Sequence, residues 1–295
     1  MPISPETINK VETLLGNKIS IIGIPESGLD HEVFIFTTPA GKKCIAKANH
    51  NAVVDALVLR KLEESGISIP TPKVLAYSEE YKLSVIEFIE GKMLDAFETP
   101  TIVPYLLPLL TIARRIHQVT GNQAGAFLKV SRGAGSDWKS SFGAKYGDNH
   151  PYYKWDNLIQ NPGLDKEVII TALGRIKAGI ESLPEPQTYS LLHSDLHGGN
   201  VIVAKNEIKG IIDWSDANYG DPLYEFSRIR LFVVQENKKM LEIYYNLLDM
   251  SAEEKQREEL YFLAHALRIV FFANEEKVPS LLKPNYERLE RLVRG

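Results

Sequence analysis

The sequence predicts an α+β fold: a small antiparallel sheet region with one main helix, followed by a larger and mainly helical region. Short apolar runs separated by turn residues fill residues 1–88, and their alternation is typical of strands that are buried on one face. Beyond residue 100, apolar residues recur at helical spacing over longer stretches. We therefore predict two domains, residues 1–88 and residues 89–295.

The first domain is predicted to begin with a short helix and to contain one further helix among its strands. Residues 5–15 place apolar side chains at helical spacing, and Gly16 ends that helix. The main helix carries Asp55 and ends before Pro70, because proline cannot continue a helix. Strands are expected at residues 21–24, 33–37, 43–47, 74–77 and 83–88.

The second domain is predicted to be built mostly of helices. Asp221-Pro222 is typical of a helix start, and Ser251 with Glu254 forms a capping box. Pro108 predicts a kink or a later start in the first of these helices. Helices are expected at residues 103–119, 164–183, 238–249, 251–272 and 281–293, and after Asp221.

Composition excludes several classes of protein. A net charge of −4 gives no electrostatic reason to expect a nucleic acid or an anionic membrane as partner. The one cysteine, Cys44, excludes an intrachain disulfide framework and fits a reducing compartment. No apolar run approaches the ~20 residues that a membrane helix needs, and no secretory signal is visible. We expect a cytoplasmic protein.

Polar residues interrupt two short apolar runs between residues 190 and 214. Asp195 and Asn200 are five residues apart across a loop with two glycines, and Asp213 follows Ile-Ile thirteen residues later. A carboxylate and an amide oxygen from adjacent strands are hard ligands that suit Mg²⁺. Asp195 then remains to accept a proton from an attacking hydroxyl. This division of roles matches the chemistry of phosphoryl transfer.

These motifs resemble those of the aminoglycoside phosphotransferase and choline kinase family, small-molecule kinases with a protein-kinase-like two-lobed fold. The shared motifs are His193-x-Asp195-x-x-x-x-Asn200, Ile-Ile-Asp213-Trp and Gly-Asp-Pro-Leu-Tyr. The chain departs from the family pattern at Ser194, where Gly is common, and at Glu225, where Asp is frequent. Neither departure removes the base or a metal ligand.

The resemblance implies an enzyme that transfers the γ-phosphoryl group of ATP, with Mg²⁺, to a hydroxyl of a small molecule. Asp195 would accept or orient the hydroxyl proton, and His193 would orient the loop. Asn200 and Asp213 would hold the metal, while Lys47 would steady the phosphates. Residues 1–88 would then be the nucleotide-binding lobe and residues 89–295 the catalytic and substrate-binding lobe. GTP stays open as the donor.

The resemblance also implies a nucleotide site in the first lobe. Asp55 stands where a Glu normally pairs with the strand lysine, here Lys47, and Glu63 is the other candidate partner. Backbone groups in the loop that holds Ser27 and Gly28 would cover the phosphates. The remaining candidates are Glu87 and Ile89, whose backbone would bind adenine, and Ile45 and Ile212, which would line the base.

The insert at residues 121–163 has no clear periodicity and interleaves aromatic residues with carboxylates. We expect it to shape the acceptor pocket, because such side chains can hold an amine-bearing sugar or a choline-like cation; they suit a core and its surface equally well. His197 is a further candidate to face the acceptor. An aminoglycoside, another antibiotic, choline, a ketosamine and homoserine all remain compatible acceptors.

Two other functions fit the motifs. A kinase-like scaffold can bind a nucleotide or metabolite without catalysis. A metal hydrolase can use a cluster of histidine and aspartate ligands, and the candidates for that cluster are His193, Asp195, His197, Asp213 and Asp216. The oligomeric state, monomer or homodimer, stays open.

Overall fold

The computed structural model describes residues 3–25, 32–49, 51–97, 99–147, 150–235 and 237–295. Contacts divide the chain into two compact units. The first unit comprises Met1–Val119 and Asp195–Ala217, and the second comprises Thr120–Ser194 and Asn218–Gly295. The first unit thus holds the predicted sheet region together with the segment that carries Asp195, Asn200 and Asp213. The functional division at residue 88 stays a prediction.

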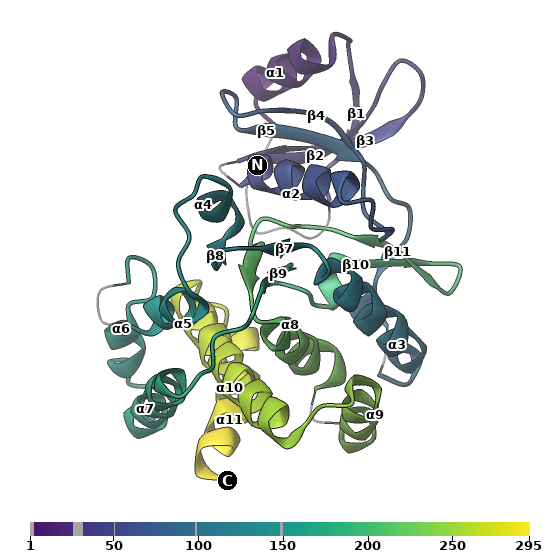
Figure 1. Cartoon of the computed structure of the whole chain (residues 1–295). Coiled ribbons are helices and arrows are strands. Elements are labelled where there is room, and N and C mark those ends of the chain that lie inside the picture. The colour runs from purple at the N-terminus through teal and green to yellow at the C-terminus, as the bar shows by residue number, and fades with distance from the viewer. Residues whose placement is uncertain (1–2, 26–31, 50, 98, 148–149, 236) are drawn as a thin grey trace. The chain divides into compact units, whose positions relative to one another are not determined.

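A five-stranded antiparallel sheet forms the centre of the first unit (Figure 1), in the strand order β1-β2-β3-β5-β4. The strands are β1 Ser20–Gly23, β2 Glu32–Thr37, β3 Lys43–Ala48, β4 Val74–Ser78 and β5 Leu83–Glu87, as the alternation predicted. Cys44 and Ala46 face a core that includes Val11 of α1 Pro5–Leu15. Because side chains alternate along a strand, Ile45 and Lys47 lie on the opposite face.

The main helix, α2 Ala52–Glu64, packs against β4 and β5. Its buried side chains are largely apolar, and Asp55 is the acidic residue among them. Gly66 follows with a φ of 70°, a left-handed conformation that glycine adopts without steric cost. The helix therefore presents one carboxylate to the interior of the first unit.

Helix α3 Thr99–Ile116 begins earlier than the prolines predicted. Pro104 and Pro108 both lie inside it, so the expectation of a later start was wrong. The two prolines are four residues apart and exposed, hence on one outward face of the helix. Carbonyl groups on that face that lose their N–H partner can bond water instead, which lowers the cost of proline there.

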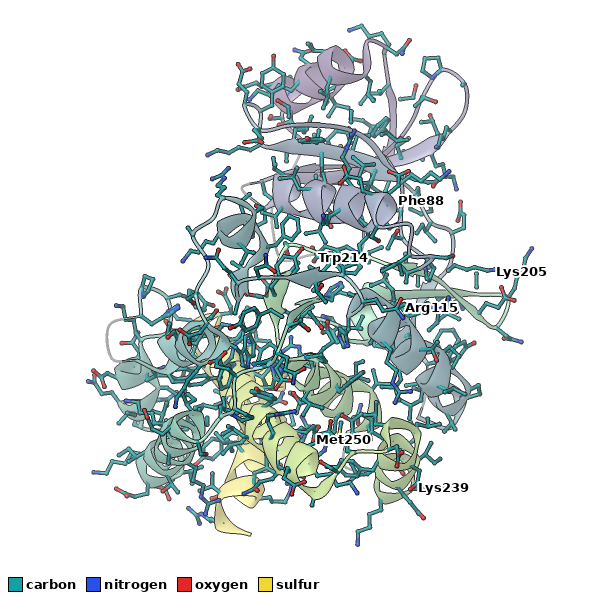
Figure 2. The ribbon with its side chains drawn as sticks, in the orientation of Figure 1. Phe88, Arg115, Lys205, Trp214, Lys239 and Met250 are labelled. Carbon is teal, nitrogen blue, oxygen red and sulfur yellow. The ribbon has the colours of Figure 1, made fainter. Side chains whose placement is uncertain are left out.

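A hairpin completes the first unit. It joins β10 Val201–Ala204 to β11 Glu207–Ile211, and β6 Lys92–Met93 pairs with β10. Lys205 and Asn206 form its two-residue turn with φ values of 51° and 62°, as a type I′ turn requires. Figure 2 shows Lys205 at the tip of this hairpin. The 3₁₀ turn η3 Gly198–Asn200 leads into β10 and contacts the 3₁₀ turn η1 Leu94–Ala96.

The second unit combines a sheet of very short strands with helices. Its strand order is β7-β9-β12-β8, formed by Thr120–Gly121, Tyr189–Leu192, Asn218–Gly220 and Gly125–Ala126. The helices are α4 Phe127–Ser131, α5 Trp138–Gly143, α6 Trp155–Ile159, α7 Lys166–Glu181, α8 Pro222–Ile229, α9 Lys238–Leu248, α10 Ala252–Glu275 and α11 Pro279–Arg294, with the 3₁₀ turn η2 Ala144–Tyr146 and a π-helical turn at Arg230–Val234. The predicted helices are present, and Asp221 and Ser251 cap α8 and α10.

Most aromatic residues of the insert belong to the core of the second unit. Trp138, Phe142, Tyr146 and Trp155 are at most 5% exposed. Trp138 donates its Nε1 hydrogen to Tyr261 Oη at 2.7 Å and packs edge-to-face on that ring. The core alternative therefore holds for these four residues, whereas Tyr152 is 49% exposed. In the described part of the chain, no helix has the length and apolar character that crossing a membrane requires.

Gly220 provides a test of this core. A Cβ at Gly220 would lie 2.2 Å from Trp138 Cζ3, and the indole is held by its bond to Tyr261. We expect Gly220→Ala to lower the free energy of unfolding by about 1–3 kcal/mol. Gly174→Ala in α7 is the matched control, because a Cβ there meets nothing within 4 Å. Urea unfolding of both variants checks the prediction; equal midpoints would contradict it.

Two buried histidines predict a pH dependence of stability. Burial, and secondarily Arg114, lowers the pKa of His117 to about 3. Burial also lowers the pKa of His265, whose Nε2 hydrogen bonds to Tyr224 O. Both stay neutral in the fold but bind protons in the unfolded chain below pH ~6.5. The free energy of unfolding should therefore fall as pH drops from ~6.5, by about 1.4 kcal/mol per unit for each histidine.

Urea unfolding at pH 7.0, 6.0 and 5.0 measures this slope. His265→Gln removes one of the two titrating groups. The free energy of unfolding of this variant should therefore change less steeply with pH than that of the natural chain, by up to about 1.4 kcal/mol per pH unit. An identical slope in the two proteins would contradict the prediction.

Candidate functional site

Lys47 lies between two carboxylates in the first unit. Its Nζ is 2.9 Å from Asp55 Oδ2 and 3.4 Å from Asp213 Oδ1. The side chain of Lys47 is 15% exposed and that of Asp55 only 1%, whereas that of Asp213 is 47% exposed. The ion pair expected on α2 thus forms with Asp55. The shorter carboxylate suffices because α2 brings it to the face of β3 that carries Lys47.

The charge of Lys47 is maintained by these neighbours. Burial by itself would lower the pKa of the ammonium group, but Asp55 and then Asp213 more than offset this effect and raise the pKa above its ordinary value. Lys47 is therefore a permanently charged and largely desolvated cation at neutral pH. Such a group interacts strongly with an anionic ligand, because little water screens it.

The segment that follows β11 is held by side-chain hydrogen bonds. Trp214 N donates to Asp55 Oδ1 at 2.9 Å, and Ser215 Oγ donates to Asp213 Oδ1 at 3.2 Å. The Trp214 ring is fully buried, and its Nε1 donates to Ile211 O. These contacts orient Asp213, which has a φ of 65°.

Asn200 and Asp195 form a second polar pair close to that segment. Asn200 Nδ2 donates to the backbone oxygen of Asp195 at 2.9 Å and to its Oδ2 at 3.2 Å. Ile212 N donates to Asn200 O at 3.0 Å, so the backbone before Asp213 runs beside Asn200. The structure thus gathers Lys47, Asp55, Asp195, Asn200 and Asp213 in one unit.

His197 contacts the same pair. Its Nδ1 accepts a hydrogen bond from Gly199 N at 3.0 Å, which leaves the proton of a neutral ring on Nε2. Nε2 lies 3.4 Å from Asp195 Oδ2. His197 therefore orients the Asp195 carboxylate, a role that the sequence did not suggest.

The donor set fits a magnesium ion. Asn200 Oδ1 and Asp213 Oδ2 accept no hydrogen bond from any residue that the structure describes. An amide oxygen and a carboxylate oxygen are hard ligands that suit Mg²⁺. Within the described ranges, no three His, Cys, Asp or Glu side chains form a metal-binding group, and the hydrolase alternative gains no support.

The remaining nucleotide candidates occupy the first unit. Ile45 faces Ile86 across the β3–β5 pair, and Glu87 ends β5. Ile89 packs on Gly210 of β11, where a Cβ would lie 2.6 Å from Ile89 Cδ1. Ile45, Ile89 and Ile212 are each partly exposed. Their contact with a base stays a prediction. Ser27 and Gly28 lie outside the described residues.

Glu225 holds the backbone of His193 and Ser194, at the start of the His193-x-Asp195-x-x-x-x-Asn200 motif, within the second unit. Its carboxylate, fully buried, accepts hydrogen bonds from His193 N at 2.5 Å and from Ser194 N at 3.2 Å. Ser194 has a φ of 67°, and its Oγ accepts from Asn218 Nδ2. Asp195 follows directly in the chain. The sequence marked Glu225 only as a departure from the family pattern, because its burial and its hydrogen-bond partners appear only in the fold.

Residues 23–258 match the model of the phosphotransferase enzyme family, APH. The chain belongs to this family. The resemblance drawn from the motifs is therefore confirmed, and so is the prediction that the protein is a phosphotransferase.

The phosphotransferase is similar to one curated enzyme, the hygromycin-B 4-O-kinase of Escherichia coli. The two are 25% identical over 168 residues, which span 55% of this chain and 48% of the kinase. The similarity thus covers about half the length of that relative.

Solved structures with the same fold cover nearly the whole chain. Aminoglycoside phosphotransferase APH(4)-Ia has a TM-score of 0.74 at 19% identity, covering 99% of both chains. A thermostable mutant of it in a ternary complex with AMP-PNP and hygromycin B gives 0.74 at 21% identity over 98% of both. A putative fructosamine-3-kinase from Thermobifida fusca gives 0.63 at 17% identity, covering 96% of this chain and 98% of that one. These likenesses confirm the α+β, protein-kinase-like fold.

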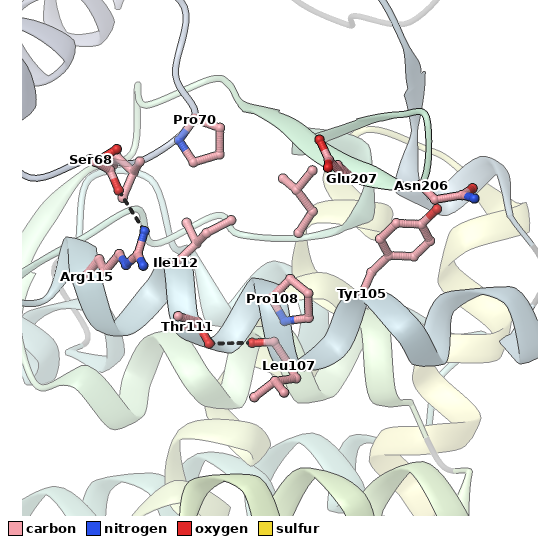
Figure 3. Close-up of a pocket in the computed structure, with 12 residues that line it drawn as sticks. Ser68, Pro70, Tyr105, Leu107, Pro108, Thr111, Ile112, Arg115, Asn206 and Glu207 are labelled. Carbon is pink, nitrogen blue, oxygen red and sulfur yellow. Dashed lines mark hydrogen bonds between the residues drawn. The ribbon is translucent and has the colours of Figure 1, made fainter.

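A separate pocket of about 630 Å³ lies in the first unit of the phosphotransferase (Figure 3). It is bounded by α3, residues 68–70 and the turn of the β10–β11 hairpin. Arg115 lies at one end, where its Nη1 donates to Ser68 O, and Glu207 lies at the other. The predicted site residues do not line this pocket, so it is distinct from the polar cluster around Lys47.

Glu225 allows a direct test of how the motif is held. Glu225→Ala leaves two buried N–H groups without their acceptor, and we expect it to lower the free energy of unfolding by about 2–4 kcal/mol. Glu225→Gln keeps one oxygen acceptor and should lose about half as much. Chemical denaturation measures both, with the exposed Glu242→Gln on α9 as control. A loss in Glu225→Ala no larger than in the control would refute this support.

Proposed function

We propose that this phosphotransferase transfers the γ-phosphoryl group of ATP, with Mg²⁺, to a hydroxyl of a small molecule. The observation that carries the proposal is the desolvated Lys47 cation held between Asp55 and Asp213. A buried lysine beside oxygen ligands for a divalent cation matches the requirements of a triphosphate.

Each residue of the cluster has a separate role in the proposed reaction. Lys47 would bind phosphate oxygens, while Asn200 and Asp213 would hold the metal. When bound there, Mg²⁺ would neutralise negative charge on the phosphoryl group that is transferred. Positioning and charge neutralisation then supply most of the rate enhancement.

Asp195 would act on the acceptor. Its carboxylate takes the proton of the acceptor hydroxyl while the hydroxyl oxygen forms its bond to the γ-phosphorus and the bond to the leaving ADP breaks. Hydrogen bonding to Asn200 and the contact with His197 orient the Asp195 carboxylate. His193 contributes through the loop backbone that Glu225 holds.

The relatives support the choice of donor and acceptor. One solved relative is a complex with AMP-PNP and hygromycin B, and another with ADP and hygromycin B. Hygromycin B is therefore the first acceptor to test, followed by other aminoglycosides, macrolides, choline, ketosamines and homoserine. ATP is the expected donor, and GTP is tested beside it.

Two substitutions test the proposal. We expect Asp213→Ala to abolish nucleotide-dependent turnover, because it removes a metal ligand. Asp195→Asn should retain nucleotide binding and lower kcat by about 10²–10⁴-fold, because it cannot accept the proton. Asp249→Asn is the matched control, since Asp249 is exposed and its left-handed backbone conformation suits Asn equally.

Coupled ADP-release assays with the acceptor panel, together with calorimetric binding of AMP-PNP, measure these effects. Full activity of Asp195→Asn would remove that residue from the mechanism. Tight nucleotide binding without turnover of any acceptor would favour the non-catalytic scaffold. Activity without a nucleotide in a zinc- or manganese-containing protein would favour the hydrolase.

A further inference from the structure

The two carboxylate oxygens of Asp55 contact different partners. Oδ2 lies 2.9 Å from Lys47 Nζ, and Oδ1 accepts a hydrogen bond from Trp214 N at 2.9 Å. The side chain is 1% exposed, so water does not compete for either oxygen. One buried carboxylate therefore joins the lysine of β3 to the backbone that immediately follows Asp213.

The backbone at Asp213 needs such support. Its φ of 65° is in the left-handed region, which is sterically less favourable for a residue with a Cβ than for glycine. Conformations of this kind persist only where surrounding contacts hold them. The bond from Trp214 N to Asp55 fixes the peptide that follows Asp213, and hence the direction in which the Asp213 side chain points.

We propose that Asp55 is a positioning residue for Asp213 as well as for Lys47. This inference rests on the proposed function, because it assigns Asp213 to the metal. A single carboxylate thereby couples the phosphate-binding lysine to the metal-binding aspartate. Loss of Asp55 weakens metal binding even where Lys47 is absent.

Loss of Asp55 also changes the charge around Lys47, and this change has a second effect on metal binding that depends on Lys47. Among the residues that the structure describes, Asp55 and Asp213 are the two carboxylates paired with the Lys47 ammonium group. Without Asp55, Lys47 interacts with Asp213 alone and competes with the metal for Asp213 Oδ1. The backbone effect and the charge effect are separable, because only the charge effect disappears when Lys47 is removed.

The length of Asp55 matters for this coupling. Glu, the residue usual at this position in the family that the motifs resemble, is one methylene longer. Asp reaches both partners at 2.9 Å with α2 in its observed place on the sheet. Asp55→Glu restores the charge but displaces the carboxylate from at least one partner, so it should not restore metal binding.

A double-mutant cycle tests the inference by binding rather than by turnover. The proteins are the natural chain, Lys47→Ala, Asp55→Ala and the double variant, each with saturating AMP-PNP. The probe is Mn²⁺, whose free concentration is measured by electron paramagnetic resonance. We expect Asp55→Ala to raise the Mn²⁺ dissociation constant about tenfold even in the Lys47→Ala background, as loss of one charge-assisted hydrogen bond implies.

Asp55→Asn in the Lys47→Ala background separates the backbone effect from a general loss of structure. Its amide oxygen can still accept the Trp214 N–H, so the Mn²⁺ dissociation constant should stay within about twofold of Lys47→Ala alone. Thermal unfolding verifies that each variant is folded. If Asp55→Ala does not fold, Asp55→Glu takes its place in the cycle and should weaken Mn²⁺ binding.

Equal Mn²⁺ affinity in Lys47→Ala and in the double variant would overturn the inference, and so would weak binding in Asp55→Asn. Failure of the proposed function gives a different result. A natural chain that binds Mn²⁺ and AMP-PNP but phosphorylates no acceptor would contradict that function while the cycle still decides the role of Asp55. A natural chain that binds neither would overturn both.

Discussion

The buried ion pair between Lys47 and Asp55 is the interaction on which the candidate site depends. Removing two charges from water is costly, and the cost is offset only where geometry and further hydrogen bonds satisfy both groups. Here the pair is completed by Asp213 and by the Trp214 N–H. The strand alternation of β3 and the packing of α2 bring the charges together. The first unit is thus organised so that a cation can be buried.

The backbone at Ser194 and the backbone at Asp213 are held by the same kind of interaction. Ser194 and Asp213 both have left-handed backbone conformations that are unfavourable for residues with a side chain. In each case a buried acid accepts a nearby backbone N–H, Glu225 from Ser194 and Asp55 from Trp214. Charge-assisted bonds of this kind are strong where water is excluded. Both acids stand where the chain departs from the expected family pattern.

Asp195, the proposed proton acceptor, differs from these supporting acids in its exposure to solvent. Asp195 and His197 are each roughly a quarter exposed, whereas Asp55 and Glu225 are almost completely buried. A proton acceptor must reach a ligand from solvent, while a group that fixes the backbone gains strength from being dry. Exposure thus separates groups suited to chemistry from those that hold them in place.

The sequence by itself determined the strands of the first unit, the capped helices of the second and the membership of Asp195, Asn200 and Asp213 in one motif. These features depend on short-range periodicity, capping and spacing, which neighbouring residues define. Tertiary structure alone decided that Asp55 pairs with Lys47, that four insert aromatics form a core, and that α3 accommodates two prolines. Each outcome depends on which surfaces meet or face solvent, and no local pattern records that. Glu225 shows this most clearly, because its partners lie more than thirty residues earlier in the chain and only folding brings them within hydrogen-bond distance.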